Sequence, residues 1–367
     1  MIAFYDYQRR HPQAKADLLR IIRERGASAE FILKTASAEL EEALCRGTGA
    51  AHAVCVSSAT SAMMLAMKAL GIGPGDEVVT PAFSYIASAS AVAMVGATPV
   101  FADVDEASFT LDPAALAARL GARSKAVVAV HLCSALADMP ALRRQMPKGL
   151  ALVEDSATSF GAKLDGVAAG CLGDVGVYSF FPAKPLGGIG DGGAVVSADG
   201  ALADTVRMLR NHGQDGKTRF THHLLGFNSR MDEINARWLQ QGLLGYPLEL
   251  ARKQAIALRY DEGLARLEGR VALQQRNTQD FVPHAYVIRC AERDALAAHL
   301  LARGIETRVH FSQALPLQPA FAHLGHRPGD FPVAEKLARE TLAIPLHAQL
   351  SDAEVAQILQ AINGFWQ

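Results

Sequence analysis

One feature constrains the fold of this chain more than any other: between residues 50 and 200, short apolar runs alternate with helical segments. Seven apolar runs, at 53–57, 77–80, 99–104, 126–131, 150–154, 175–180 and 193–197, are expected to be strands. The segments 61–70, 84–95, 113–120 and 138–145 between them are expected to be helices. This alternation is typical of βα units that build a mostly parallel sheet covered on both faces. The sequence therefore predicts an α/β fold with a mostly parallel seven-stranded sheet.

The pattern changes after residue 230. Residues 232–265 are expected to form one long helix, broken or kinked near Pro247. Beyond it the sequence predicts strands at 284–289 and near 307–309, a helix at 293–303, and closing helices from 333 and 351. We interpret residues 1–245 as a large domain and residues 246–367 as a smaller α+β C-terminal domain.

Composition excludes several classes of protein. The chain has 367 residues, is 50% hydrophobic, and balances 36 basic against 37 acidic residues, so it gives no electrostatic footprint for nucleic acid or an anionic membrane. Its most apolar stretch, 87–102, contains serine and threonine and is too short to span a membrane, and no secretory signal precedes it. Five scattered cysteines without a CxxC pair favour free thiols over disulfides or a metal site. We expect a cytoplasmic protein whose partner is a small molecule.

The segment 179–193, SFFPAKPLGGIGDGG, is the most informative motif. Lys184 follows an apolar strand, stands between Pro182 and Pro185, and precedes a run of glycines. A lysine held in an apolar loop loses part of the solvation that favours its charge, so it becomes a nucleophilic amine suited to a Schiff base. The alternative at this point is an ordinary lysine of a surface loop.

A second feature is Asp155, at the end of the apolar run 150–154. Acids at the carboxyl ends of parallel strands face the crevice where ligands bind. A buried carboxylate together with a Schiff-base lysine is what pyridoxal phosphate requires, because the acid keeps the pyridine nitrogen protonated. Capping of the next helix is the competing interpretation of Asp155.

Two weaker signals follow other strands. Residues 57–61, SSATS, place hydroxyls and helix-start amides where a phosphate would bind, although serine and threonine are also common N-caps. Tyr85, just after the run 77–80, offers a ring that stacks on a flat cofactor or packs in the core.

Taken in order, these segments resemble the DegT/DnrJ/EryC1/StrS family of pyridoxal-phosphate sugar aminotransferases over nearly the whole chain. The matching motifs include GDEV at 75–78, GATPV at 96–100, ED at 154–155, SFFPAKPLG at 179–187, NHG at 211–213, GFNSRMDEI at 226–234 and IPL at 344–346. The resemblance implies the aspartate-aminotransferase fold (fold type I) with pyridoxal 5′-phosphate as cofactor. SFFPAKPLG, HGQD at 212–215 and NSR at 228–230 are similar to the branch acting on UDP-linked keto-hexuronates, the 3-aminotransferases.

The resemblance also implies roles for single residues. Lys184 would bind the cofactor aldehyde and shuttle a proton, as the catalytic residue. The cofactor-binding residues would be Ala59, Thr60, Tyr85, Asp155, Thr158, Ser179 and Asn228. Asn228 would reach the phosphate in a neighbouring subunit, which implies a homodimer with shared active sites. Arg230, Arg308 and His310 are candidate substrate residues. His222 and His223, beside Arg219, could contact a substrate phosphate or carboxylate, but a loop of this composition is more often solvated.

The chain departs from the family pattern at several positions. Thr158 stands where glutamine is usual, Ala59 where the phosphate turn has glycine, and Cys133-Ser134 where Tyr-Gly is usual. The segment 310–316, HFSQALP, also differs from the usual His-Tyr-x-x-Pro-Leu-His in a region that lines the sugar pocket. We expect these changes to leave cofactor binding intact and to alter which substrate groups are recognised.

The expected function is amino transfer, from glutamate, to a keto group of a nucleotide-linked sugar. Two alternatives remain open at this point. The first is another pyridoxal-phosphate reaction of a natural-product pathway, on a keto-cyclitol or other non-nucleotide substrate. The second is a catalytically silent regulator or partner subunit on the same fold, against which the presence of Lys184 argues.

Overall fold

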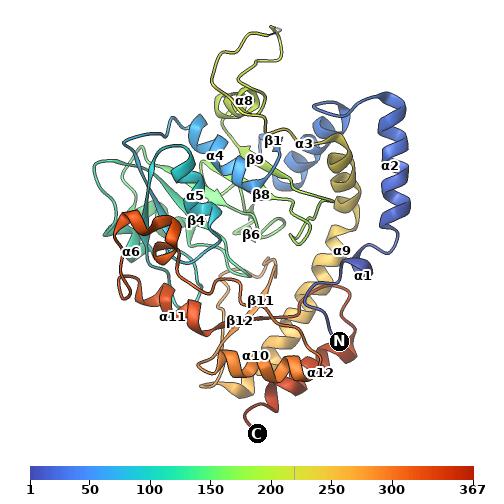
Figure 1. Ribbon diagram of the computed structural model, residues 1–367, viewed down its shortest axis with the longest axis vertical. Coiled ribbons are helices and arrows are strands. Elements are labelled where there is room, and N and C mark those ends of the chain that lie inside the picture. Colours follow the sequence, from blue (N-terminus) through green and yellow to red (C-terminus); the bar gives the residue numbers. More distant parts are fainter. Residues whose placement is uncertain (219) are drawn as a thin grey trace.

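A seven-stranded, mostly parallel sheet forms the centre of the protein (Figure 1). The structure is a computed structural model that describes residues 1–218 and 220–367. Its strand order is β1-β9-β8-β5-β4-β2-β3, and β9 alone runs antiparallel to both of its neighbours. The strands are β1 (His52–Val56), β2 (Glu77–Pro81), β3 (Thr98–Ala102), β4 (Ser124–Val130), β5 (Ala151–Asp155), β8 (Val175–Ser179) and β9 (Gly193–Ser197). All seven predicted strands are confirmed, with shifts of one or two residues at their ends.

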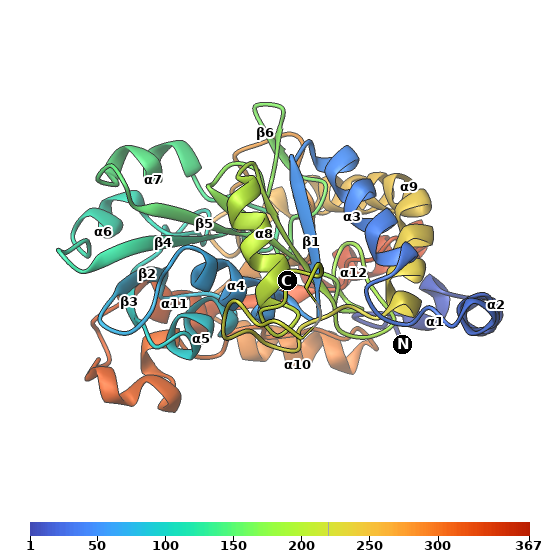
Figure 2. The same ribbon diagram turned by 90° about the horizontal axis from the view of Figure 1, so that it is seen from above.

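Helices cover both faces of this sheet (Figure 2). Because successive strand residues point to opposite faces, Val54 and Val56 join one core whereas Ala53 and Cys55 join the other. One face packs against α4 (Ala59–Ala69), α5 (Ala87–Met94) and α8 (Gly200–Leu209). The other packs against α3 (Thr35–Thr48), α6 (Pro113–Ala117), α7 (Met139–Gln145) and α9 (Glu233–Leu264). The predicted three-layer α/β architecture is confirmed.

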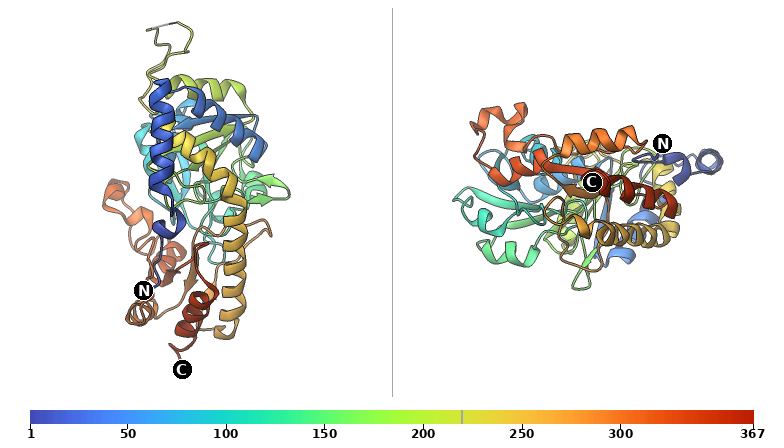
Figure 3. Two further views of the ribbon diagram at one scale, coloured as in Figure 1. Left: turned by 90° about the vertical axis from the view of Figure 1, so that its right-hand side faces the viewer. Right: turned by 90° about the horizontal axis from the view of Figure 1, so that it is seen from below.

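Helix α9 is 32 residues long and runs beside α2 (Ala14–Ser28), from the sheet down to the C-terminal part of the molecule (Figures 1 and 3). It continues through Pro247, so the helix is not broken at this position, and the alternative that it is kinked there stays a prediction. The residues around the proline are anchored on both sides: the Tyr246 hydroxyl donates to the Phe160 carbonyl, and Leu250 packs against the core beneath. Packing of this kind holds the helix although proline offers no amide hydrogen.

Glu233, the first residue of α9, explains part of the motif at 226–234. Its fully buried carboxylate accepts hydrogen bonds from the amides of Lys34, Ala36 and Ser37, at 2.8, 2.6 and 3.1 Å, and one at 2.6 Å from the Ser37 hydroxyl. These amides belong to the start of α3, where helical donors lack internal partners. Glu233 therefore caps α3 from a distant part of the chain.

The C-terminal part holds a three-stranded antiparallel sheet and a separate core. Its elements are β10 (Ala272–Leu273), β11 (Tyr286–Arg289), β12 (Thr341–Ile344), α10 (Arg293–Ala302), α11 (Pro332–Glu340) and α12 (Asp352–Asn363). The predicted strand near 307–309 is wrong, because Arg308 makes only a single bridge, to Ala343. Ile2 also packs in this core, so the first residues of the chain lie with the last. The boundary at 245/246 falls inside α9 and stays a prediction.

The remaining elements are short connections. They are α1 (Tyr7–Arg10), the hairpin of β6 (Lys163–Leu164) and β7 (Val167–Ala168), and 3-10 turns at Ala265–Leu267, Leu315–Leu317 and Pro319–Leu324. Within the described residues, every helix is too short or too polar to cross a bilayer.

Candidate active site

A cavity of about 420 Å³ opens where the carboxyl ends of β4, β5 and β8 meet the start of α4. Ligands of open α/β sheets bind at this edge of the sheet. The wall of the cavity brings together eight of the predicted site residues: Ala59, Thr60, Tyr85, Asp155, Thr158, Ser179, Lys184 and His310. These eight residues, which the sequence singled out separately, therefore lie together in one cavity.

Lys184 reaches the cavity from the loop after β8. Within residues 180–188 that loop is held by two backbone hydrogen bonds, from the Lys184 amide to the Phe181 carbonyl and from the Gly188 amide to the Phe180 carbonyl, both 2.8 Å. Burial of the side chain lowers the pKa of the amine, against the opposing charge of Asp155. The neutral, nucleophilic amine is therefore easier to form than in a lysine exposed to solvent, and Lys184 is not an ordinary surface lysine.

Asp155 is the last residue of β5 and is buried beside the cavity. One carboxylate oxygen accepts the amide of Ala157 at 3.1 Å. Burial raises the pKa of Asp155, while that amide and the charge of Lys184 pull it back. A turn follows instead of a helix, so the competing interpretation as a helix cap does not apply. A cationic ring nitrogen placed here would favour the ionised carboxylate.

A buried pair, His131 and Glu154, lies behind Asp155. The His131 Nδ1 accepts the amide of Ala137 at 2.9 Å, so its proton lies on Nε2, which donates to Glu154 at 2.7 Å. Burial alone would raise the pKa of Glu154, but the hydrogen bonds from His131 and the surrounding amides lower it overall. The sequence analysis missed His131, although its place after an apolar run is the same signal that identified Asp155.

The phosphate side of the cavity is the first turn of α4. Ser58 caps this helix by accepting the amide of Ser61 at 3.1 Å, and the Ala62 amide bonds the Ser58 carbonyl at 2.9 Å. The helix begins two residues earlier than predicted, so Thr60 lies inside its first turn, where amides precede the first internal bond. Such a helix start is a ready anion site.

Gly193, at the start of β9, leaves room for this turn. A Cβ at Gly193 would stand 2.5 Å from the Ser58 carbonyl carbon and 2.6 Å from the Ala59 amide nitrogen. Only glycine fits so close to another backbone. The backbone of β9 therefore supports the turn that would hold a phosphate.

These walls fit pyridoxal phosphate. The amine of Lys184, the carboxylate of Asp155 and the start of α4 would meet its aldehyde, ring nitrogen and phosphate, and Ser179 lines the same cavity. Tyr85 stands at the rim with 65% of its surface exposed, where a ring could cover a flat cofactor. Thr158 also lines the cavity, but its hydroxyl donates to the His131 carbonyl at 2.9 Å.

The rest of the cavity wall combines residues that lie far apart in the sequence. Tyr5, Cys133, His284, His310 and Phe311 line it, and of these the sequence singled out only Cys133 and the segment that begins at His310. Burial lowers the pKa of His310 to about 4 and that of His284 well below its usual range, and it raises the pKa of Tyr5 to about 12. All three side chains are therefore neutral hydrogen-bonding groups at pH 7.

Three predicted residues lie elsewhere in this chain. Asn228 pairs with Asn211, and the Arg230 guanidinium donates to the Asn211 side chain at 3.2 Å. Arg308 stacks over Phe4, near His310 but outside the cavity wall. Their roles stay predictions.

The histidines of the loop before Asn228 lie away from the cavity as well. His222 bonds the His212 carbonyl and His223 faces Asp215, as in a solvated loop. Arg219 lies outside the described residues.

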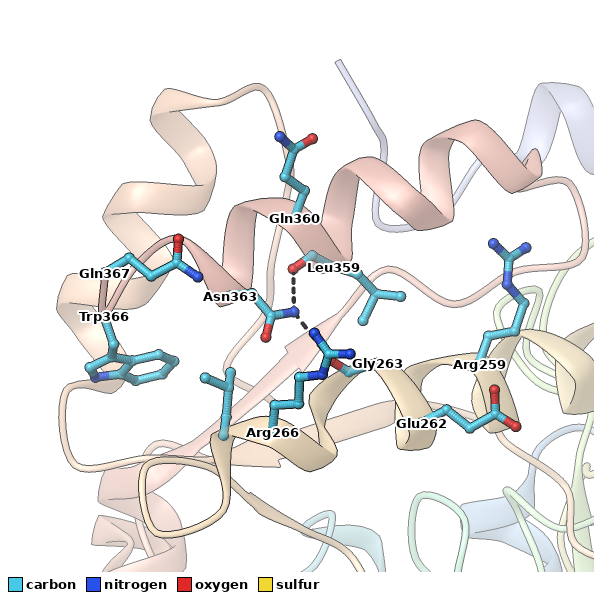
Figure 4. A pocket seen from close by; sticks show the side chains of 10 residues that line it. Arg259, Glu262, Gly263, Arg266, Leu359, Gln360, Asn363, Trp366 and Gln367 are labelled. Atoms are coloured by element: carbon cyan, nitrogen blue, oxygen red, sulfur yellow. Dashed lines mark hydrogen bonds between the residues drawn. The ribbon is translucent and has the colours of Figure 1, made fainter.

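A second hollow, of about 580 Å³, lies at the end of α9 against α12 (Figure 4). Its wall carries Arg259, Arg266, Asn363 and Trp366, and the Asn363 amide donates to the carbonyls of Gly263 and Leu359. Although larger, this hollow lacks a buried lysine and acid facing one another. The described residues also hold no group of side chains suited to a metal ion.

Comparison with known proteins gives a consistent picture. Residues 12–363 match the model of the DegT/DnrJ/EryC1/StrS aminotransferase family. A "Pleiotropic regulatory protein" of Geobacillus stearothermophilus is 36% identical, with 100% of this chain and 99% of that protein covered. The UDP-2-acetamido-2-deoxy-3-oxo-D-glucuronate aminotransferase of Pseudomonas aeruginosa is also 36% identical, with 99% of this chain and 100% of that protein covered.

Solved structures agree with the sequence comparisons. The crystal structure of DesV from S. venezuelae has a TM-score of 0.94 at 36% identity and covers 100% of this chain and 99% of its own. The PLP form of a putative sugar aminotransferase from Streptococcus pneumoniae has a TM-score of 0.88 at 28% identity, covering 95% and 96%.

Proposed function

The chain belongs to the DegT/DnrJ/EryC1/StrS aminotransferase family, and we propose that it transfers an amino group from glutamate to a keto group of a nucleotide-linked sugar. It is a pyridoxal-phosphate-dependent aminotransferase. The observation that carries the proposal is the single cavity shared by Lys184, Asp155 and the start of α4.

Pyridoxal phosphate, when bound, supplies an aldehyde for an amine and a ring that withdraws electrons from the reacting carbon. The residues of this chain would do the rest. Asp155 would hold a proton on the ring nitrogen, and Thr60 with the amides of α4 would fix the phosphate. The amine of Lys184 would carry a proton to and from the reacting carbon.

The first experiment concerns Lys184. Purified protein should show the visible absorbance of bound cofactor, and Lys184→Ala should lose the wild-type band. An unchanged visible spectrum in the variant would refute the assignment of Lys184. Lys125, an exposed residue of β4, provides the matched control variant Lys125→Ala.

A second experiment separates amino transfer from other reactions of this cofactor. Incubation with glutamate alone should convert the cofactor to its amine form and release 2-oxoglutarate. Absence of this half-reaction would favour the alternative of a non-transaminating enzyme, and complete silence with every substrate would favour a regulator. The buried, pKa-lowered amine of Lys184 supports catalysis.

The substrate class can be narrowed further. The glucuronate aminotransferase of P. aeruginosa acts, by its name, on a UDP-linked keto-hexuronate. His310 in the wall, with Arg308 close by, supports an acidic sugar for this chain too. A panel of UDP- and dTDP-linked keto sugars, with and without a carboxylate, should show a preference for the acidic members. Equal rates would contradict this part of the proposal.

We also propose a homodimer with shared active sites. The described residues 213–218 and 220–225 project from the body of the molecule (Figure 3), and Leu225 is 95% exposed. Asn228 lies outside the cavity of its own chain, which fits a role in the cavity of a partner.

Mixed dimers test this arrangement. Equal amounts of Lys184→Ala and Asn228→Ala chains should regain about one quarter of wild-type activity, since half of random dimers carry one intact site. No recovery would mean that both residues act within one chain.

The free state of all five cysteines leads us to place the dimer in the cytoplasm.

A further inference from the structure

The loop that carries Lys184 is bound from outside by Arg10, the last residue of α1. The Arg10 guanidinium donates to the carbonyls of Pro182 and Pro185, at 3.0 and 2.8 Å, and makes a longer contact of 3.4 Å to the carbonyl of Lys184 itself. One side chain thus touches three carbonyls within four residues of the loop.

The opposite edge of the guanidinium is paired with Glu249 of α9. The two side chains approach to 3.0 Å, with a second contact of 3.3 Å from Nε. Their side chains are only 13% and 22% exposed, so this ion pair is shielded more than a surface pair. Arginine suits the position because its planar fork offers five donors and stays charged.

The loop depends on these contacts. Prolines 182 and 185 offer no amide hydrogen, and only two backbone bonds lie within residues 180–188. A Cβ on Gly187 would collide with the Pro182 carbonyl and stand 3.2 Å from the Arg10 guanidinium, so the three groups are in close contact. Without Arg10, the carbonyls of Pro182 and Pro185 would require water, which would enter beside the amine.

We propose that Arg10, held by Glu249, is a positioning residue that fixes the Lys184 loop and keeps water from the amine. This inference rests on the proposed role of Lys184. Through Arg10, the N-terminal segment would take part in the reaction, because this side chain connects the loop of Lys184 to Glu249 in the middle of α9. Arg10 itself lies outside the cavity wall and touches no reacting atom.

The chain offers a matched control in Arg9. It lies on the same helix, but its guanidinium binds Glu354 at 2.9 Å and the Gln349 carbonyl, both in the C-terminal part. Arg9→Gln therefore removes the same charge from the same helix without touching the loop. Arg10→Gln, Arg10→Lys and Glu249→Gln form the test set.

The first measurement is the pH dependence of cofactor uptake by cofactor-free protein, since only the neutral amine can react. Burial lowers the pKa of Lys184, so water entry in Arg10→Gln should raise that pKa and move the profile to higher pH. Hydrogen exchange of residues 183–188 should become faster in the same variant. In the loaded enzyme, the glutamate half-reaction should slow by about tenfold to a hundredfold. Arg10→Lys should restore part of each effect.

The outcomes separate the two proposals. If the visible band does not require Lys184, the proposed function fails. If the band requires Lys184 but Arg10→Gln and Arg9→Gln give the same pH profile and loop exchange, the positioning role of Arg10 is refuted. Should Arg10→Gln fail to fold, Arg10→Lys and Glu249→Gln are judged by the same two measurements.

Discussion

The replacement Glu154→Gln tests how the buried pair behind Asp155 is built. One oxygen of Glu154 accepts His131 Nε2–H, the Gly170 amide and the Ser156 hydroxyl, and the other accepts the amides of Leu172 and Gly173, at 2.8 and 2.9 Å. Glutamine has the same shape but replaces one acceptor oxygen with an NH₂ donor. In either orientation that donor would face other donors.

The expected loss of stability follows from the number of hydrogen bonds that the variant cannot make. If the NH₂ faces Leu172 and Gly173, two partly buried amides lose their acceptor, at about 1–3 kcal/mol each, or about 2–6 kcal/mol together. Turning the side chain would require His131 to move its proton to Nδ1, where it would face the Ala137 amide. We therefore expect Glu154→Gln to destabilise the protein by about 2–6 kcal/mol in either orientation.

Urea unfolding of the cofactor-free protein measures this loss. Glu77→Gln is the control, because Glu77 pairs with Arg123, whose side chain is 73% exposed, and such pairs contribute about 0–1 kcal/mol. The pKa of Glu154 lies below the ordinary 4.5, so its stabilisation is present above that pH and is lost as pH falls below it. The variant should lose this pH dependence. A stability equal to that of Glu77→Gln would refute the reasoning.

Three further predictions concern the cavity. Because burial lowers the pKa of Lys184, cofactor uptake should rise with pH through a midpoint below 10.5, the ordinary value for lysine; a midpoint at or above 10.5 would contradict this. Thr60→Val should weaken cofactor binding by up to about tenfold in a fluorescence titration, since one hydrogen bond to a phosphate is lost, whereas unchanged affinity would remove Thr60 from the phosphate site. With its pKa near 4, His310 stays neutral at pH 5 to 8. The rise in KM for the keto sugar in His310→Asn should therefore be the same across that range, and a rise confined to acid pH would instead require the charged ring.

Much of the site could be predicted because strand ends are visible in sequence. Asp155, Ser179 and Lys184 all follow apolar runs, and parallel strands bring their carboxyl ends to one edge of the sheet. The same logic would have identified His131, which ends the run at β4. Its partner Glu154 was quoted only as part of a motif, because spacing along the chain does not reveal a pairing between neighbouring strands.

Other features depend on contacts between distant parts of the chain. Tyr5 and His284 reach the cavity from opposite ends of the sequence, and Arg10 carries no local sign of its three carbonyl partners. The expected strand near 307–309 failed for a similar reason: Arg308 exchanges two backbone bonds with Ala343, at 3.0 and 2.8 Å, before the chain turns toward His310. Tertiary packing, which no local pattern contains, decided these cases.

The pairing of the two chain ends has a consequence for synthesis on the ribosome. Ile2 bridges Ile305, the Phe4 amide bonds Glu306, and Arg9 binds Glu354, so residues 2–9 find these partners only after residues 305–354 have been made. The cavity wall formed by Tyr5, His284 and His310 is likewise completed only after residue 310 has been made. The central sheet can form before residues 284–310 are made, whereas the wall that closes around vitamin B6 depends on them.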